Sequence, residues 1–247
     1  MMAARLIERN AYVYRRSWLV FLTGFLEPVL YLFSIGVGLG ALVGDIGGVD
    51  YASFVAPAML AASAMNGAVF EATFGVFFKL RYTKLYDTVL ATPLRPRDVA
   101  VGEISWALLR GAIYSAAFLA VMWAAGYVHS AQAVLVLPAA TLIGFAFAAL
   151  GMAATTYMTS WQDFEYITLA TLPLFLFSAT FYPLSTYPPL GQLLVQISPL
   201  YSGVALIRGL TLGTTGPAAL AHAGYLLALG WLGVAVASRR LDRLLLR

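Results

Sequence analysis

The chain has 247 residues, of which 61% are hydrophobic and 11% are charged, and its mean hydropathy is +0.83. Soluble domains carry about 25% charged residues, so this composition excludes a water-soluble fold and predicts several membrane spans. The lack of cysteine excludes disulfides and thiolate metal sites, and the net charge of +4 comes from short basic loops rather than a nucleic-acid-binding surface.

The first 17 residues predict an amphipathic helix that lies in the membrane interface. Leu6, Tyr12 and Val13 can share an apolar side, while four arginines and Glu8 stay polar. The segment lacks the apolar core of a cleavable signal peptide. We expect an interfacial domain over residues 1–17, a membrane domain over residues 18–237 and a basic tail over residues 238–247.

The membrane domain contains six apolar segments that predict transmembrane helices. A hydrocarbon core of about 30 Å needs roughly 20 residues of helix. The fifth segment is short and ends at a Phe-Tyr-Pro sequence. The predicted fold is therefore an all-α integral membrane protein with six spans: Trp18–Leu42, Ala52–Phe77, Ile104–Gly126, Ala133–Met158, Tyr166–Thr180 and Ala218–Ala237.

The basic residues indicate how these spans are oriented. Thirteen of the 15 Lys and Arg residues lie in the N-terminal segment, in the loop between spans two and three, and in the C-terminal tail. The loops at 43–51 and 127–132 have none, and the short loop at 159–165 carries only acidic charge. The positive-inside rule therefore places both termini in the cytoplasm.

The loop over residues 79–103 combines five basic residues with a short amphipathic core from Lys84 to Ala91, which Pro93 and Pro96 close. A soluble partner can bind such a cytoplasmic helix and transmit force through it, so the helix predicts a transport subunit driven by another chain. Residues spaced by three or four share one helical face. The contact with the partner is therefore expected from Leu85, Tyr86, Val89 and Leu90, with Lys84 beside them.

Residues 181–213 are too apolar for an ordinary loop and are cut by four prolines. The two apolar pieces that remain, Leu190–Ile197 and Tyr201–Leu212, are both too short to span. We expect two short re-entrant helices that dip in from the outer side, which is possible only where protein or a water-filled cavity surrounds them.

Several polar residues fall inside the predicted spans. An intramembrane carboxylate such as Glu27 or Glu71 is costly and suggests a functional site, although helix packing is the alternative for each. Asn66, Phe70 and Phe74 can share one helical face, where they could line a substrate path or hold helices together. In span three, Glu103 and Arg110 could neutralise a group such as Glu71 or pair with a partner protein.

Catalytic motifs are absent. The sequence has no GxxxxGKS/T phosphate loop and no HExxH, CxxC or GxSxG motif, so we expect no enzyme activity, no metal site and no cofactor in this chain. His129 and His222 lie far apart without partners for a site. A membrane enzyme acting on lipids is thus the weakest alternative. An ion-coupled secondary transporter is the stronger one, but the two halves show no inverted repeat.

The residues resemble one known family over nearly the whole chain. Five blocks in their order and spacing are similar to the type-2 ABC exporter permeases, most closely the branch around the nodulation-factor exporter permeases. They are FLEPVLYLFSIGVGLG (25–40), FVAPAMLAASAMNGAVFEATFGVFFKLR (54–81), KLYDTVLATPLRPRDVAVGEI (84–104), PLFLFSATFYPLSTYP (173–188) and SPLYSGVALIRGLTLG (198–213). One departure is Ser202, where relatives commonly have histidine.

The resemblance implies a mechanism and partners that the residues alone do not. Members of this family have six spans, dimerise in the bacterial inner membrane and bind two separate ATPase subunits, which hold ATP and Mg²⁺. A coupling helix between spans two and three rests on the ATPase. Substrates are amphiphiles such as glycolipids, lipid-linked glycans, oligosaccharides or drugs. The second permease can be identical or related. From the residues themselves, aromatic and weakly polar side chains recur in spans one, two and five, so we expect these spans to line a substrate path along the dimer interface, through Phe25, Glu27, Asn66, Phe70, Phe74, Phe177 and Phe181.

Overall fold

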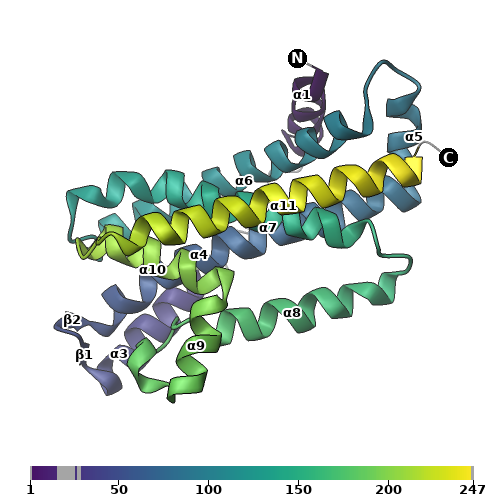
Figure 1. The fold of residues 1–247 in the computed structure, drawn as a ribbon. Helices are drawn as coiled ribbons and strands as arrows, with labels where there is room; N and C mark the ends of the chain where they lie inside the picture. Colours follow the sequence, from purple (N-terminus) through teal and green to yellow (C-terminus); the bar gives the residue numbers. More distant parts are fainter. Residues whose placement is uncertain (1, 16–25, 27–28, 246–247) are drawn as a thin grey trace.

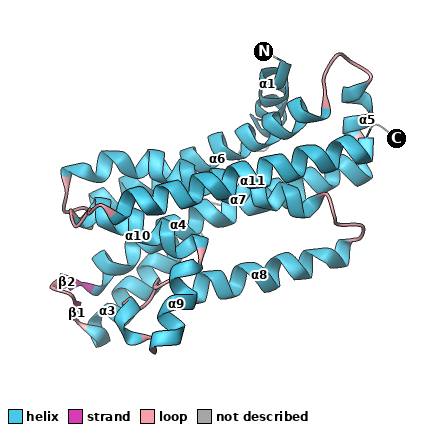
Figure 2. Cartoon of the chain, viewed as in Figure 1, coloured by secondary structure: helices cyan, strands magenta, loops and turns pink. Residues whose placement is uncertain are grey.

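The structure is a computed structural model that describes residues 2–15, 26 and 29–245, and this part of the chain is almost entirely helical (Figure 2). By length and composition, four of its helical segments can cross a membrane, or five if one bent pair counts as a span. This confirms the prediction of a helical protein with several membrane spans. The count of six spans stays a prediction.

Four long helical segments run side by side in a bundle (Figure 1). They coincide with predicted spans two, three, four and six and are long and apolar enough to cross a membrane, but three of them extend beyond the predicted cytoplasmic end, to Tyr82, Pro96 and Leu245. Membrane thickness limits the apolar length of a helix and not its total length, so the basic residues continue the helices into water. The segments are α4 (Tyr51–Phe70) with η2 (Glu71–Gly75) and η3 (Phe78–Tyr82), α6 (Pro96–Ala124), η4 (Ala131–Leu135) with α7 (Val136–Thr155), and α11 (Ala218–Leu245).

Helix α7 is the centre of this bundle and packs against α4, α6 and α11. Its approach to α11 is so close that glycine is needed there. A Cβ built on Gly233 of α11 would lie 2.6 Å from the backbone carbon of Ala149 and 2.8 Å from the nitrogen of Leu150. Small residues at such contacts let two helix backbones approach, which is how membrane helices gain packing energy without a hydrophobic driving force.

We therefore expect Gly233→Ala to destabilise the protein, because the two backbones must move apart. Overpacking of this kind costs typically 1–3 kcal/mol. The check is the thermal unfolding midpoint of the purified protein. Gly224→Ala on the same helix is the matched control, since nothing lies within 4 Å of its added Cβ. Equal midpoints for the two variants would contradict the close packing of α7 and α11.

Predicted spans one and five look different from the other four. The beginning of span one lies outside the described residues, and its end forms η1 (Leu32–Val37) and α3 (Gly38–Val43). Span five was predicted over Tyr166–Thr180, but α8 (Phe164–Leu176) has 13 residues and follows the short turn η5 (Trp161–Asp163). The helix ends there because Phe177 leaves the helical conformation and Ala179 has a positive φ of 55°.

One end of the bundle carries a hairpin and two short helices. Strands β1 (Asp45–Ile46) and β2 (Val49–Asp50) pair antiparallel, with both glycines of the turn at positive φ. After the turn η6 (Leu184–Thr186), α9 (Pro189–Ile197) and α10 (Pro199–Leu212) meet at an angle of 87°. The two short helices expected before the last span are therefore present. Their re-entrant arrangement stays a prediction.

Arg208 connects the segments at this end of the bundle. From α10 its guanidinium donates hydrogen bonds to the carbonyl oxygens of Phe54 at 3.1 Å and Ala179 at 2.9 Å, and it lies 3.9 Å from the centre of the Phe54 ring. Nearby, the Tyr51 hydroxyl donates to the carbonyl of Phe181. The bent pair is thus fixed both to the start of α4 and to the segment after α8.

The opposite end of the bundle carries α1 (Met2–Arg15) and α5 (Leu85–Leu90). Both ends of the described chain lie here (Figure 1). Helix α1 packs against α6, with Leu6 and Asn10 buried. The sequence placed Tyr12 and Val13 on the same side as Leu6, but both are exposed here. Of these three residues only Leu6 is covered by the described chain, and the position of α1 in the membrane interface stays a prediction.

Candidate functional site

A cavity of about 630 Å³ opens between α4, α6 and α8. Its walls are mostly apolar and aromatic, with a few hydroxyl and amide groups. Concave, largely apolar sites with few polar groups are the usual form of a small-molecule site. The lining residues include Asn66, Phe70 and Phe74 of the α4 segment, and α8 contributes a stripe at helical spacing: Phe164, Ile167, Thr168, Thr171, Leu172 and Phe175.

Aromatic rings close one part of this cavity. The rings of Phe70 and Phe74 are stacked with their centres 4.9 Å apart. The centre of the Phe74 ring also lies 4.1 Å from that of Phe164 and 5.0 Å from that of Trp161, in an edge-to-face arrangement with Trp161. These contacts join the α4 segment to the start of α8. Such a cluster offers dispersion contacts and apolar burial to a hydrocarbon chain.

An ion pair lies at one wall of the cavity, with its cation on the wall and its anion behind it. Arg110 stands midway along α6 and lines the cavity together with Tyr114, while the carboxylate of Glu71, only 2% exposed, is bound to the Arg110 guanidinium. The Arg110 Nε also donates to the Tyr114 hydroxyl at 3.1 Å. Charges far from water need this pairing, because an isolated charge in such surroundings is strongly unfavourable.

A second polar cluster joins three helices at the end that carries α5. The Glu103 carboxylate on α6 accepts hydrogen bonds from Lys79 Nζ of η3 at 2.6 Å and from Asn10 Nδ2 of α1 at 3.1 Å. Tyr86 of α5 is fully buried beside it. Burial, and then the nearby charge of Glu103, raise the pKa of the Tyr86 phenol well above its usual range, so it stays neutral.

Helix α5 itself turns its polar side outward. Lys84, Asp87 and Thr88 are exposed, as is Ala91 just beyond the helix, and this spacing places them on one face. Leu85 and Val89 are half-buried and pack on the core, and Lys84 begins the helix with a positive φ of 47°. The expected docking residue Tyr86 is therefore not available to another chain, which corrects the expectation for that residue.

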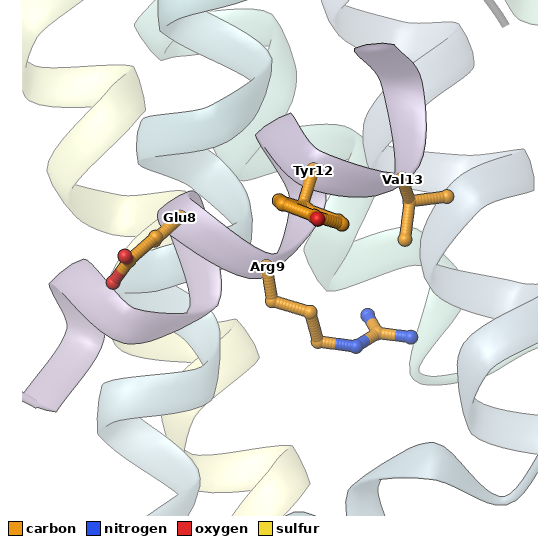
Figure 3. Close-up of a pocket in the computed structure, with 4 residues that line it drawn as sticks. All are labelled: Glu8, Arg9, Tyr12 and Val13. Atoms are coloured by element: carbon orange, nitrogen blue, oxygen red, sulfur yellow. The ribbon is translucent and has the colours of Figure 1, made fainter. Parts of the chain in front are cut away.

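A shallow hollow also lies against α1. Figure 3 shows Glu8, Arg9, Tyr12 and Val13 projecting from this one helix, and the space beside them measures about 390 Å³. Arg9 is bonded to its neighbour Asn10, and so touches the second polar cluster. All four side chains come from a single exposed helix, so the hollow is a surface feature rather than an enclosed site.

Comparisons with known proteins match the chain over most of its length. The family described as ABC-2 type transporter matches residues 4–212. The chain belongs to the ABC-2 type transporter family. It is 35% identical to Nodulation protein J of Rhizobium leguminosarum bv. trifolii over 242 residues, which cover 96% of this chain and 92% of that protein.

Two further relatives place the chain within this family. Nodulation protein J of Rhizobium meliloti (strain 1021) is 31% identical over 88% of this chain and 82% of its own length. The inner membrane transport permease YadH of Escherichia coli (strain K12) is 24% identical over 76% of this chain and 72% of its own length. Proteins of the ABC-2 family are permeases that work with ABC ATPase subunits, so the chain is a membrane transport protein.

The structure brings together only some of the residues expected along the path of this permease. Asn66, Phe70 and Phe74 line the cavity. Phe177 is exposed just after α8. Phe181 is not in the lining, although its ring packs against that of Phe175, which is. The expected path residues Phe25 and Glu27 lie outside the described residues. For the coupling residue Leu90, the structure describes the backbone at the end of α5 but not the side chain.

The sequence analysis expected span five to line the path through Phe177 and Phe181, but it missed the residues of α8 that line the cavity. These six residues recur at intervals of three and four, and this spacing was readable in the sequence. It was not recognised because every face of this segment is apolar enough to meet lipid. The pairing of Arg110 with Glu71 was among the expected alternatives and is confirmed, whereas Glu103 pairs with Lys79 instead. His222 Nδ1 lies 3.1 Å from the Ser202 hydroxyl oxygen, so an imidazole from α11 stands beside this position of α10.

Proposed function

We propose that this permease is the membrane subunit of an ATP-driven exporter that moves an amphiphile out of the cytoplasm or the inner leaflet. The observation that carries the proposal is the cavity between α4, α6 and α8, which combines aromatic walls with Asn66 and Arg110. An acyl or polycyclic group suits the aromatic part, and a polar head suits the amide and guanidinium. Glycolipids, lipid-linked glycans, oligosaccharides and drugs are the candidate classes.

The energy comes from two separate ATPase subunits, which bind ATP and Mg²⁺, since the sequence has no phosphate loop of its own. They dock at the end of the bundle that carries α5, in the cytoplasm together with both termini. The concentration of Lys and Arg at this end supports the orientation, in the inner membrane of a bacterium. A second permease, identical or related, completes the path, and residues 79–103 form the coupling loop between two spans.

The single-chain alternative is an ion-coupled transporter in which Glu71 exchanges protons. The ion pair with Arg110 argues against it, because the Glu71 carboxylate is already bound to a guanidinium. Glu71 therefore acts as a fixed charge in this proposal.

The test is to purify the tagged permease from its own cells and to reconstitute what co-purifies. We expect a phosphate-loop ATPase in the preparation, and uptake of a fluorescent amphiphile into inside-out vesicles only when hydrolysable ATP is present. A non-hydrolysable ATP analogue is the control. Transport by the single chain driven by a proton gradient alone, with no ATPase bound, would refute the proposal.

A further inference from the structure

We propose that the ion pair between Glu71 and Arg110 sets the charge of the head group that the cavity accepts, favouring uncharged, acceptor-bearing heads over anionic ones. The proposal rests on the proposed function, because it takes the cavity as part of the substrate path. It assigns to Glu71 the role of a specificity-determining countercharge, although its side chain is not itself part of the lining.

The geometry separates the two charges relative to the cavity. Arg110 and Tyr114, one turn apart on α6, are on the wall, and Arg110 is the charged member among the described residues that line it. Glu71 lies behind the wall, buried and bound to the guanidinium. A ligand in the cavity therefore meets the cation first and the carboxylate just behind it.

The chemistry of these groups decides which ligand fits. A guanidinium has only N–H donors, so it selects a head that offers oxygen acceptors. Its charge is already balanced by Glu71, and an anionic head would place a second negative charge close to the first in surroundings of low dielectric, where repulsion is strong. Uncharged hydroxyl and carbonyl oxygens gain the hydrogen bonds without that repulsion.

The opposite reading is that the pair only holds α4 and α6 together. The second ion pair in the described chain, between Lys79 and Glu103, does hold helices together and lies away from the cavity lining. It therefore supplies a matched control for the loss of one carboxylate. A purely structural role for Glu71 would make Glu71→Gln and Glu103→Gln behave alike towards ligands.

The experiment compares two amphiphiles with the same ring and tail, dodecyl glucoside and the anionic dodecyl glucuronide. Their dissociation constants are measured on the purified permease in lipid nanodiscs without nucleotide. The wild type is expected to bind the glucoside more tightly. Glu71→Gln removes the negative charge bound to Arg110 behind the wall, so the ratio of affinities should move towards the glucuronide by at least tenfold. Glu103→Gln should leave that ratio unchanged.

Instability of Glu71→Gln is covered by a second measurement, its thermal unfolding midpoint in membranes with each amphiphile added. The glucuronide should raise this midpoint more than the glucoside does, because it supplies the missing negative charge. An unchanged affinity ratio in a folded Glu71→Gln, equal protection by the two amphiphiles, or no binding of either one to the wild type overturns the proposal. Since no ATP or partner is present, a failure of the ATP-driven exporter function appears in the co-purification test and not in this one.

Discussion

Replacing Arg110 with leucine is expected to remove most of the folded permease from the membrane. Glu71 is 2% exposed and does not line the cavity, so the substitution leaves a carboxylate buried without its guanidinium. Breaking one side of a buried ion pair costs about 3–5 kcal/mol. Folded proteins are stable by about 5–15 kcal/mol, so this is a large share of the total.

The double variant Arg110→Leu with Glu71→Leu should recover much of the loss. Replacing both members of a buried pair with apolar groups is often neutral or stabilising, because neither charge has to be desolvated. The measurement is the yield of monodisperse protein after extraction, together with its unfolding midpoint. Leu109→Ala, on an exposed position of the same helix, is the control for a general sensitivity of α6. A double variant as unstable as Arg110→Leu would show that the pair does more than neutralise charge.

The two single changes should differ in severity. In Glu71→Gln the remaining charge is Arg110, which reaches the cavity and keeps its bond to the Tyr114 hydroxyl. In Arg110→Leu the remaining charge is Glu71, which lies behind the wall. The structure thus predicts a larger loss for Arg110→Leu, and this order is what allows Glu71→Gln to be used as a binding variant.

The sequence was sufficient for features that depend on length and composition. Hydropathy located four of the spans, and the prolines marked the break between α9 and α10 to within two residues of Ser198. The basic residues predicted that the two termini and α5 lie at the same end, and in the structure the two ends of the described chain and α5 do lie together. These features follow from the thickness of the bilayer and from local backbone chemistry, so each of them can be predicted from a single segment of the sequence.

Contacts between segments were harder to predict, and Arg110 shows why. A helix that is apolar on all sides does not indicate which face meets which neighbour, so several partners for Arg110 remained open until the rotation of α4 and α6 was known. Tyr86 shows the same limit. The amphipathic pattern of α5 correctly indicated a covered apolar face, but the pattern is the same whether another chain or this chain covers it.

Reversing the charge of Asp87 is expected to abolish ATP-dependent export while leaving a folded permease. The exposed face of α5 carries Lys84, Asp87 and Thr88, and on the proposed function this face meets the ATPase. Interfaces are fixed by complementary charges, and placing like charges against each other costs several kcal/mol. Asp87→Arg should therefore lower ATP-dependent uptake by at least tenfold in vesicles that contain both subunits, with unchanged binding of dodecyl glucoside.

The same measurement on Tyr86→Asp separates docking from folding. Tyr86 is fully buried beside Glu103, so a carboxylate there would lie next to one already bound to Lys79 and Asn10. This variant should lose folded protein and glucoside binding together, whereas Asp87→Arg should lose only ATP-driven transport. On the proposed function, we expect a force on α5 to reach Glu103 through Tyr86, and with it α6, η3 and α1. Normal export by Asp87→Arg would move the ATPase contact off this face of α5, and a folded, glucoside-binding Tyr86→Asp that exports normally would contradict the route through Tyr86.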